Sequence, residues 1–272
     1  MESQPIIVVD KATKIFQSER GPVHALNDFD MVVHTGEFVS LVGPSGCGKS
    51  TLLWAMAALW PLSAGSIKIN GEEVTGPRRE VGMVFQSANL LPWRNLMKNI
   101  YFPLEIMGER PRRYQDRIDN LLEMTALTGF EHHYPGELSG GMQQRASIVR
   151  ALSYDPQVLL MDEPFGALDA FTRDEMNVML LNIWEAAQKT IVFVTHQIPE
   201  AVYLSDRVYV MTPRPGRNLK EYKIDLPRPR PLSITTESRF FEIVGDIKNT
   251  IYQGVQKATE EGAYEIEQFA HE

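Results

Sequence analysis

The segment from Phe38 to Thr51 constrains the fold more than any other stretch of the chain. The apolar, β-branched run Phe38–Val42 predicts a strand, and it leads directly into Gly43-Pro-Ser-Gly-Cys-Gly-Lys-Ser50. Glycines in such a loop let backbone N–H groups approach a phosphate closely, and a helix that follows offers its positive N-terminus. A strand, a glycine-rich loop and a helix in this order predict a phosphate-binding loop at the edge of a sheet.

The residue types within this loop assign roles to its side chains. Lys49 is expected to reach the outer phosphates, and the Ser50 hydroxyl is expected to bind Mg²⁺. For Cys47 we favour a small, tolerated residue over a thiol whose pKa is lowered by the helix N-terminus. A plain glycine-rich turn is the alternative for the whole loop, and the strand and helix around it disfavour that alternative. The predicted phosphate-binding residues are Gly43, Pro44, Ser45, Gly46, Cys47, Gly48, Lys49, Ser50 and Thr51.

A second strand pattern ends in two carboxylates. The apolar run Val158–Met161 is followed by Asp162 and Glu163. At the carboxyl edge of a buried strand, Asp162 is expected to hold the magnesium shell, and Glu163 is expected to polarise an attacking water. The alternative is a solvated strand end, and the phosphate-binding loop upstream argues against it.

Two further polar residues follow predicted strands. Gln86 ends Val84-Phe85-Gln86, and His196 follows the strand Ile191–Thr195. The Gln86 amide is expected to bind Mg²⁺ or water, and His196 to hydrogen-bond the terminal phosphate. A lone histidine is more often structural, so the position of His196 at a strand end carries this prediction.

The rest of the pattern alternates between strands and helices. The order is strand, loop and helix, then a helical insertion, then strands alternating with helices, which predicts an α/β fold with a mainly parallel sheet. Thr172 and Glu175 are expected to form a capping box for the helix that follows. Further strands are expected at Ile6–Val9, Phe29–Val33, Ser66–Asn70, Val81–Phe85 and Val208–Met211, and helices within Leu96–Leu127, from Gly140 and over Thr236–Thr259.

Composition limits the partners and the cellular compartment that we expect for this chain. A net charge of −8 argues against a nucleic-acid partner, and one cysteine excludes an intramolecular disulfide and favours a reducing cytoplasm. The N-terminus lacks the pattern of a signal peptide, and Leu52–Leu62, the most apolar window, is shorter than a bilayer span. We therefore expect a chain that does not cross a membrane by itself.

A second glycine-rich segment, Leu138-Ser-Gly-Gly-Met-Gln-Gln-Arg145, is the most informative for function. It is redundant if the chain binds one nucleotide alone. It has a purpose if Ser139, Gly140 and Gly141 contact the nucleotide held by a different copy of the chain. This interpretation makes ATP the link between two copies, and its hydrolysis the step that releases them.

Six elements together resemble the ATP-binding subunits of ABC transporters. They are the phosphate-binding loop, Gln86, the Ser139 segment, Leu159-Leu-Met-Asp-Glu-Pro164, Ala167-Leu168-Asp169 and His196, in that order. The resemblance covers about residues 6–212 and implies an ABC-type P-loop NTPase with a mainly parallel sheet core, an antiparallel β subdomain and an inserted helical subdomain at about 87–157. The implied domains are 1–232 for ATP binding and 233–272 for a C-terminal helical extension.

The resemblance also implies cofactors, partners and further site residues. ATP and Mg²⁺ are the expected cofactors. Ser139, Gly140, Gly141 and Gln143 are expected to complete the ATP site of the opposing copy, and Asp169 to meet that copy. Phe16 lies where the family has an aromatic residue stacked on adenine. Expected partners are a second copy, transmembrane permease subunits and, indirectly, a substrate-binding protein, at the cytoplasmic face of the cell membrane.

A finer similarity points to the importers of nitrate, sulfonate, taurine and bicarbonate. It is carried by Leu91-Pro-Trp93, Thr212-Pro-Arg-Pro-Gly-Arg217 and Leu226-Pro-Arg-Pro-Arg230. A rigid basic loop is the alternative for the last two segments. Trp93 is interpreted as an apolar anchor for a membrane subunit, with a core tryptophan as the alternative.

Other classes of function remain open. Another importer class, or a soluble ABC ATPase that acts on DNA or ribosomes, would use the same motifs, although the latter usually carries a coiled-coil insertion or tandem ATP sites. A P-loop kinase or small-molecule NTPase would leave the Ser139 segment without a purpose. The solute, and whether the ATPase subunits are identical, are not encoded in these motifs.

Overall fold

The computed structural model describes residues 4–19 and 21–260. These residues divide into two compact units. The first holds the described residues up to Pro77 and from Phe193 onward, and the second is Arg78–Val192. The strand β8 (Thr190–Val194) crosses the division.

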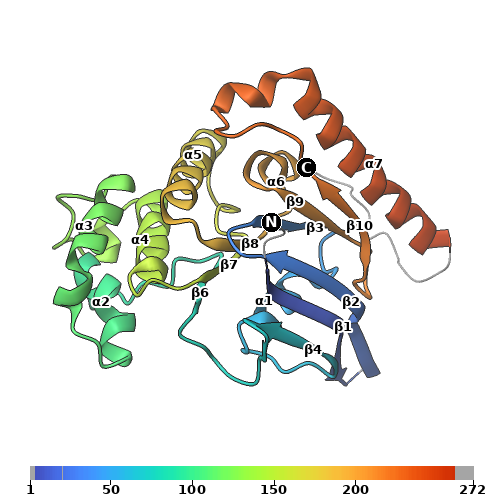
Figure 1. Cartoon of the computed structure of the whole chain (residues 1–272), viewed down its shortest axis with the longest axis horizontal. Coiled ribbons are helices and arrows are strands. Elements are labelled where there is room, and N and C mark those ends of the chain that lie inside the picture. The colour runs from blue at the N-terminus through green and yellow to red at the C-terminus, as the bar shows by residue number, and fades with distance from the viewer. Residues whose placement is uncertain (1–3, 20, 261–272) are drawn as a thin grey trace. The chain divides into compact units, whose positions relative to one another are not determined.

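The first unit begins with an antiparallel sheet in the strand order β2-β1-β4-β5 (Figure 1). Its strands are β1 (Pro5–Ser18), β2 (Gly21–His34), β4 (Ala64–Ile69) and β5 (Glu72–Glu73). In β1, Val8 pairs with Val32 on one side and with Lys68 on the other. The strands predicted at Ile6–Val9 and Phe29–Val33 are therefore parts of one long hairpin.

The same unit also contains parallel strands. The fully buried β3 (Phe38–Val42) pairs in parallel with β9 (Arg207–Met211), and β10 (Asn218–Lys223) pairs antiparallel with β9. The helices of this unit are α1 (Lys49–Met56), α6 (Ile198–Leu204) and α7 (Ser238–Glu260). A short 3-10 turn, η3 (Leu232–Thr236), precedes α7, which buries Phe240, Ile243 and Ile247 on one face.

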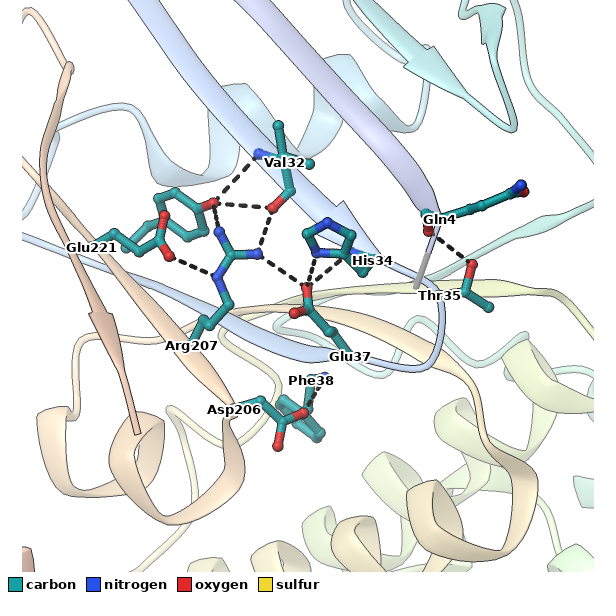
Figure 2. Close-up of polar contacts among 10 residues, drawn as sticks. Gln4, Val32, His34, Thr35, Glu37, Phe38, Asp206, Arg207 and Glu221 are labelled. Atoms are coloured by element: carbon teal, nitrogen blue, oxygen red, sulfur yellow. Dashed lines mark hydrogen bonds and ion pairs between the residues drawn. The ribbon is translucent and has the colours of Figure 1, made fainter. Parts of the chain in front are cut away.

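Arg207 joins β2, β9 and β10 (Figure 2). Its Nε donates to Glu221 Oε1 at 2.7 Å, and its Nη1 donates to the Val32 carbonyl at 2.8 Å and to Glu37 Oε2 at 3.1 Å. The neighbouring Asp206 accepts a hydrogen bond from the Phe38 N–H at 2.9 Å. One guanidinium thus connects β9 to β2, to β10 and to Glu37 just before β3.

The second unit contains two parallel strands and most of the helices. β6 (Val81–Val84) pairs with β7 (Val158–Asp162), with Val84 opposite Met161. Its α-helices are α2 (Leu96–Ile106), α3 (Gln115–Met124), α4 (Gly140–Leu152) and α5 (Ala170–Ala187). Two 3-10 turns, η1 (Pro111–Tyr114) and η2 (Pro135–Glu137), begin at prolines.

Several predicted boundaries differ from the structure. The capping box at Thr172 and Glu175 is wrong, because α5 begins at Ala170 and Asp169 is its N-cap residue. The helical stretch Leu96–Leu127 consists of two helices separated by η1, and α7 starts at Ser238 rather than Thr236. Residues 261–272 of the predicted C-terminal extension lie outside the described residues.

None of the described helices combines the length and the apolar character needed to cross a bilayer.

Candidate functional site

The phosphate-binding loop connects β3 to α1 in the first unit. Gly48 immediately precedes α1 and has φ 102°, a left-handed conformation that glycine adopts without strain. A Cβ at this position would lie 2.7 Å from the Ala25 carbonyl oxygen, so the backbone here packs directly on β2. Lys49 is buried, and its Nζ donates to the carbonyl oxygens of Gly43 and Pro44 at 3.0 Å each. The loop therefore encloses a fixed ammonium group.

This geometry fits a nucleoside triphosphate. Ser45 and Gly46 form the exposed part of the loop, and Ser50 and Thr51 lie in the first turn of α1. Backbone N–H groups at a helix N-terminus, together with a lysine, are the groups that bind phosphates. Ser50 can supply a hydroxyl oxygen, a ligand type that Mg²⁺ accepts.

Cys47 is a structural residue of this loop. Its side chain is fully buried, and burial raises the pKa of the thiol above its ordinary value. The alternative of a thiol with a lowered pKa is therefore wrong, because the desolvation outweighs the influence of the adjacent Lys49.

Phe16 lies in an aromatic group at the end of β1. Its ring meets Trp60 edge-on, with ring centroids 5.1 Å apart, and the Lys14 ammonium lies 4.9 Å from the Phe16 centroid. The ring centroids of Trp60 and Trp54 of α1 are 4.6 Å apart. Neither tryptophan was singled out from the sequence, because their proximity to Phe16 depends on the return of the chain after α1.

His196 follows β8 in the first unit and is exposed. The preceding Thr195 donates from its hydroxyl to Glu200 Oε2 at 2.5 Å and accepts from the Gln197 N–H at 3.0 Å. These bonds hold the turn between β8 and α6 on both sides of His196. Glu200 is a buried residue of α6 that the sequence reasoning missed.

The carboxyl ends of β6 and β7 lie at one edge of this strand pair in the second unit. Gln86, Asp162 and Glu163 lie at that edge. Val84 is opposite Met161, so Gln86 and Glu163 each lie two residues beyond a paired position. Asp162 is buried at 6% exposure, which excludes a solvated strand end. Glu163 has φ 44°, a left-handed conformation that redirects the chain directly after β7.

A hydrogen bond from α4 fixes the segment that leads to Gln86. The buried Gln144 donates from Nε2 to the Phe85 carbonyl at 3.1 Å. Gln86 itself is exposed. Gln144 directly follows the predicted Gln143 in the glycine-rich segment, whose Nε2 donates to the carbonyls of Pro135 and Leu138 at 3.0 and 3.1 Å.

Ser139 and Asp169 cap two neighbouring helices and line one hollow. Ser139 Oγ accepts from the Met142 N–H at 3.3 Å at the start of α4, and Asp169 Oδ1 accepts from the Thr172 N–H at 3.1 Å at the start of α5. The hydrogen bond from the Thr172 hydroxyl lowers the pKa of the Asp169 carboxyl. The hollow has a volume of about 430 Å³, and its lining includes Gly140, Gly141 and Arg145.

The predicted site residues thus form two groups, one in each unit. The first unit contains Phe16, His196 and the loop from Gly43 to Thr51. The second unit contains Gln86, Asp162 and Glu163 at the strand ends, and Ser139, Gly140, Gly141, Gln143 and Asp169 at or next to the hollow. Within each unit, residues far apart in sequence come together.

A family model described as ABC transporter matches residues 26–166, which span the phosphate-binding loop, the Ser139 segment and Glu163. This chain belongs to the ABC transporter family. The predicted recognition, the α/β fold of ABC type and the ATPase activity are thereby confirmed.

Similar proteins support a finer resemblance. The chain is 44% identical to the aliphatic sulfonates import ATP-binding protein SsuB of Bacillus cereus, over 82% of this chain and 88% of that protein. It is 42% identical to the nitrate import ATP-binding protein NrtD of Synechocystis, over 88% of this chain and 92% of that protein.

A solved structure supports the fold. It is the dimeric post-hydrolysis state of the ATP-binding cassette MJ0796 bound to ADP and Pi, with a TM-score of 0.71 and 31% identity. The alignment covers 81% of this chain and all of that one.

Proposed function

We propose that this ABC ATPase powers the import of a small anionic solute, of the nitrate, sulfonate, taurine or bicarbonate type, through separate membrane subunits. The observation that carries the proposal is the hollow shared by Ser139 and Asp169, because the first unit already has its own phosphate-binding loop. A second nucleotide-facing surface is useful if it completes the site of another copy. The importer names of SsuB and NrtD support the direction and the solute class.

In the proposed dimer, each of two ATP molecules contacts both copies. One copy contributes Lys49 and the loop backbone to the phosphates and Phe16 to the adenine. The other copy contributes Ser139, Gly140, Gly141 and the neighbouring Gln143 and Asp169. A hydrogen bond to a charged group contributes about 1.5–3 kcal/mol, so several such bonds from each side make dimerisation depend on ATP.

The residues at the strand ends carry the proposed chemistry. Ser50, Gln86 and Asp162 supply the oxygen ligands that Mg²⁺ prefers, and the ion supplies charge neutralisation at the phosphates when bound. Glu163 accepts hydrogen bonds from the attacking water and polarises it. His196 hydrogen-bonds the γ-phosphate, and the Thr195–Glu200 hydrogen bond spans the turn that holds it.

Permease subunits at the cytoplasmic face of the membrane are the proposed partners, with a substrate-binding protein acting through them. Trp93 is 71% exposed, so the alternative of a core tryptophan is wrong, and an apolar anchor for a permease segment remains the proposal. Residues 1–232 are proposed as the ATP-binding domain, with the helical part at about 87–157, and residues 233–272 as its C-terminal extension.

Purification from membranes tests this function. In mild detergent, apolar multi-span subunits should accompany the wild-type chain, and Trp93→Ala should recover less of them than Phe241→Ala, a control at another exposed aromatic residue. Absence of such subunits would favour a soluble ABC ATPase. Neighbouring reading frames for a permease and a secreted binding protein would identify an importer, and frames for a different permease type would indicate another importer class.

A further inference from the structure

A basic groove lies in the first unit, between the loop after β9 and the C-terminal part of α7. Its volume is about 360 Å³. Arg214, Arg217 and Lys257 line it together with the apolar side chains of Leu219 and Ala258. None of the described residues that line the groove is acidic.

The charges of the groove are not neutralised by neighbouring carboxylates on the arginine side. Among the residues that the structure describes, Arg214 has no ion-pair partner, and its side chain is exposed. The Arg217 guanidinium lies against the side-chain amide of Asn27, a neutral group that does not cancel its charge. Arg214 and Arg217 face one small volume, so their charges repel each other, and an anion between them removes that repulsion.

The arginine-bearing loop is held in one conformation by its own hydrogen bonds. The Thr212 hydroxyl donates to the Pro215 carbonyl at 3.0 Å and accepts from the Arg217 N–H at 2.9 Å. Gly216 donates to the Ala25 carbonyl at 2.9 Å, and its own carbonyl accepts from the Asn27 N–H at 3.0 Å. A groove whose wall is already ordered loses little entropy when it binds a ligand.

On the α7 side of the groove, the helix backbone packs closely against β10. A Cβ at Gly254 of α7 would lie 2.8 Å from Leu219 Cδ2, so the absence of a side chain at 254 lets the helix approach β10. A Cβ at Gly216 would lie 2.1 Å from the Cys47 carbonyl oxygen. The loop thus lies between the groove and the phosphate-binding loop.

We propose that this groove is a second anion site, which binds a small alkyl oxyanion such as a sulfonate. The oxygens of the ligand contact Arg214, Arg217 and Lys257, and its alkyl part contacts Leu219 and Ala258. A volume near the lower end of the range for ligand pockets suits a molecule of this size.

Calorimetric titration of the full chain with butanesulfonate tests the site. Saturating ADP and Mg²⁺ are present throughout, so that the phosphate-binding loop is filled and does not bind the probe. We expect one butanesulfonate per chain, with an affinity that falls as salt is added. The double variant Arg214→Ala with Lys257→Ala should bind it at least about tenfold more weakly, because two charge-assisted contacts are lost.

The matched control removes two other exposed cations, by Lys223→Ala on β10 and Lys248→Ala on α7. This control should bind butanesulfonate within about twofold of the wild-type chain, since only the long-range charge changes. Equal losses in both double variants, or no saturable binding by the wild-type chain, would overturn the proposal. It would also be overturned if the chain bound vesicles containing phosphatidylglycerol but did not bind butanesulfonate, because that outcome indicates a membrane surface.

Discussion

Ser139 and Asp169, thirty residues apart in sequence, line the same hollow of about 430 Å³. Each is the N-cap of a helix, so two helix N-termini border this hollow. Helix N-termini favour negatively charged ligands. In the proposed dimer, this hollow contacts the nucleotide that a second copy holds.

Glu163→Gln removes the carboxylate that is proposed to polarise water. We expect ATP binding to persist and turnover to fall by about 10²–10⁴-fold, the usual contribution of general-base help. An ATP-bound dimer should accumulate, which size-exclusion chromatography would detect. Turnover equal to that of the wild-type chain would reject the role of Glu163.

Gly48→Ala introduces a Cβ into the backbone contact with β2. Gly48 and Gly46 both have positive φ, but only at Gly48 would the Cβ approach a carbonyl oxygen within 2.7 Å. We expect the free energy of unfolding to fall by about 1–3 kcal/mol more for Gly48→Ala than for Gly46→Ala, as for other overpacked positions. Urea unfolding measures both variants, and equal losses would contradict the packing argument.

Glu221→Gln weakens the network around Arg207. The hydrogen bond from Arg207 lowers the pKa of Glu221, so its contribution to stability is present above the unfolded pKa and is lost as the pH falls through the folded pKa. For a partly exposed pair we expect a loss of about 0.2–1 kcal/mol at pH 7.

The pH dependence separates this effect from a general loss of stability. The difference between the wild-type chain and Glu221→Gln should shrink as the pH falls below the ordinary glutamate pKa of about 4.3. Glu73→Gln, at an exposed carboxylate of β5, is the control and should show no comparable difference. A constant difference from pH 7 to pH 3 would mean that Glu221 acts by packing alone.

Cys47 is the only cysteine of the chain and is fully buried. Because burial raises the pKa of its thiol, we expect a slow reaction with a thiol reagent at pH 7 and a fast reaction after unfolding. Asn249→Cys adds an exposed thiol on α7 and should introduce one fast-reacting group. Two fast-reacting groups in that variant would contradict the buried position of Cys47.

Strand ends were predictable from the sequence because they depend on local pattern. The strands β3 and β7 are buried and mainly apolar, so the pattern predicted the glycine-rich loop directly after β3 and Asp162 at the end of β7, while the roles of Lys49 and Asp162 stay predictions. The order of the motifs then identified the family. Local pattern did not separate helix starts as well, since Thr172 and Asp169 are both good N-cap residues and only one precedes the helix.

Contacts between distant segments were not predictable. Arg207 contacts Val32 and Glu221 because β2 and β10 lie beside β9, and no local signal encodes that arrangement. The same holds for Gln144 at Phe85, Trp60 at Phe16 and the groove beside Arg214. Each depends on which elements become neighbours after folding.

The central claim is that each ATP is bound by two copies of the chain. In a Glu163→Gln background, a heterodimer can be formed from one copy with Ser139→Arg and one copy with Lys49→Ala. It contains one intact composite site, made of Lys49 from the first copy and Ser139 from the second, and one site that lacks both groups. Each homodimer contains only damaged sites.

The stoichiometry of tightly bound ATP in this heterodimer is the most direct measurement. We predict one ATP per heterodimer and none in either homodimer. If Ser139 acted on the nucleotide of its own copy, both sites of the heterodimer would be damaged, and a stoichiometry of zero would contradict the claim. Two ATP per heterodimer would contradict it as well.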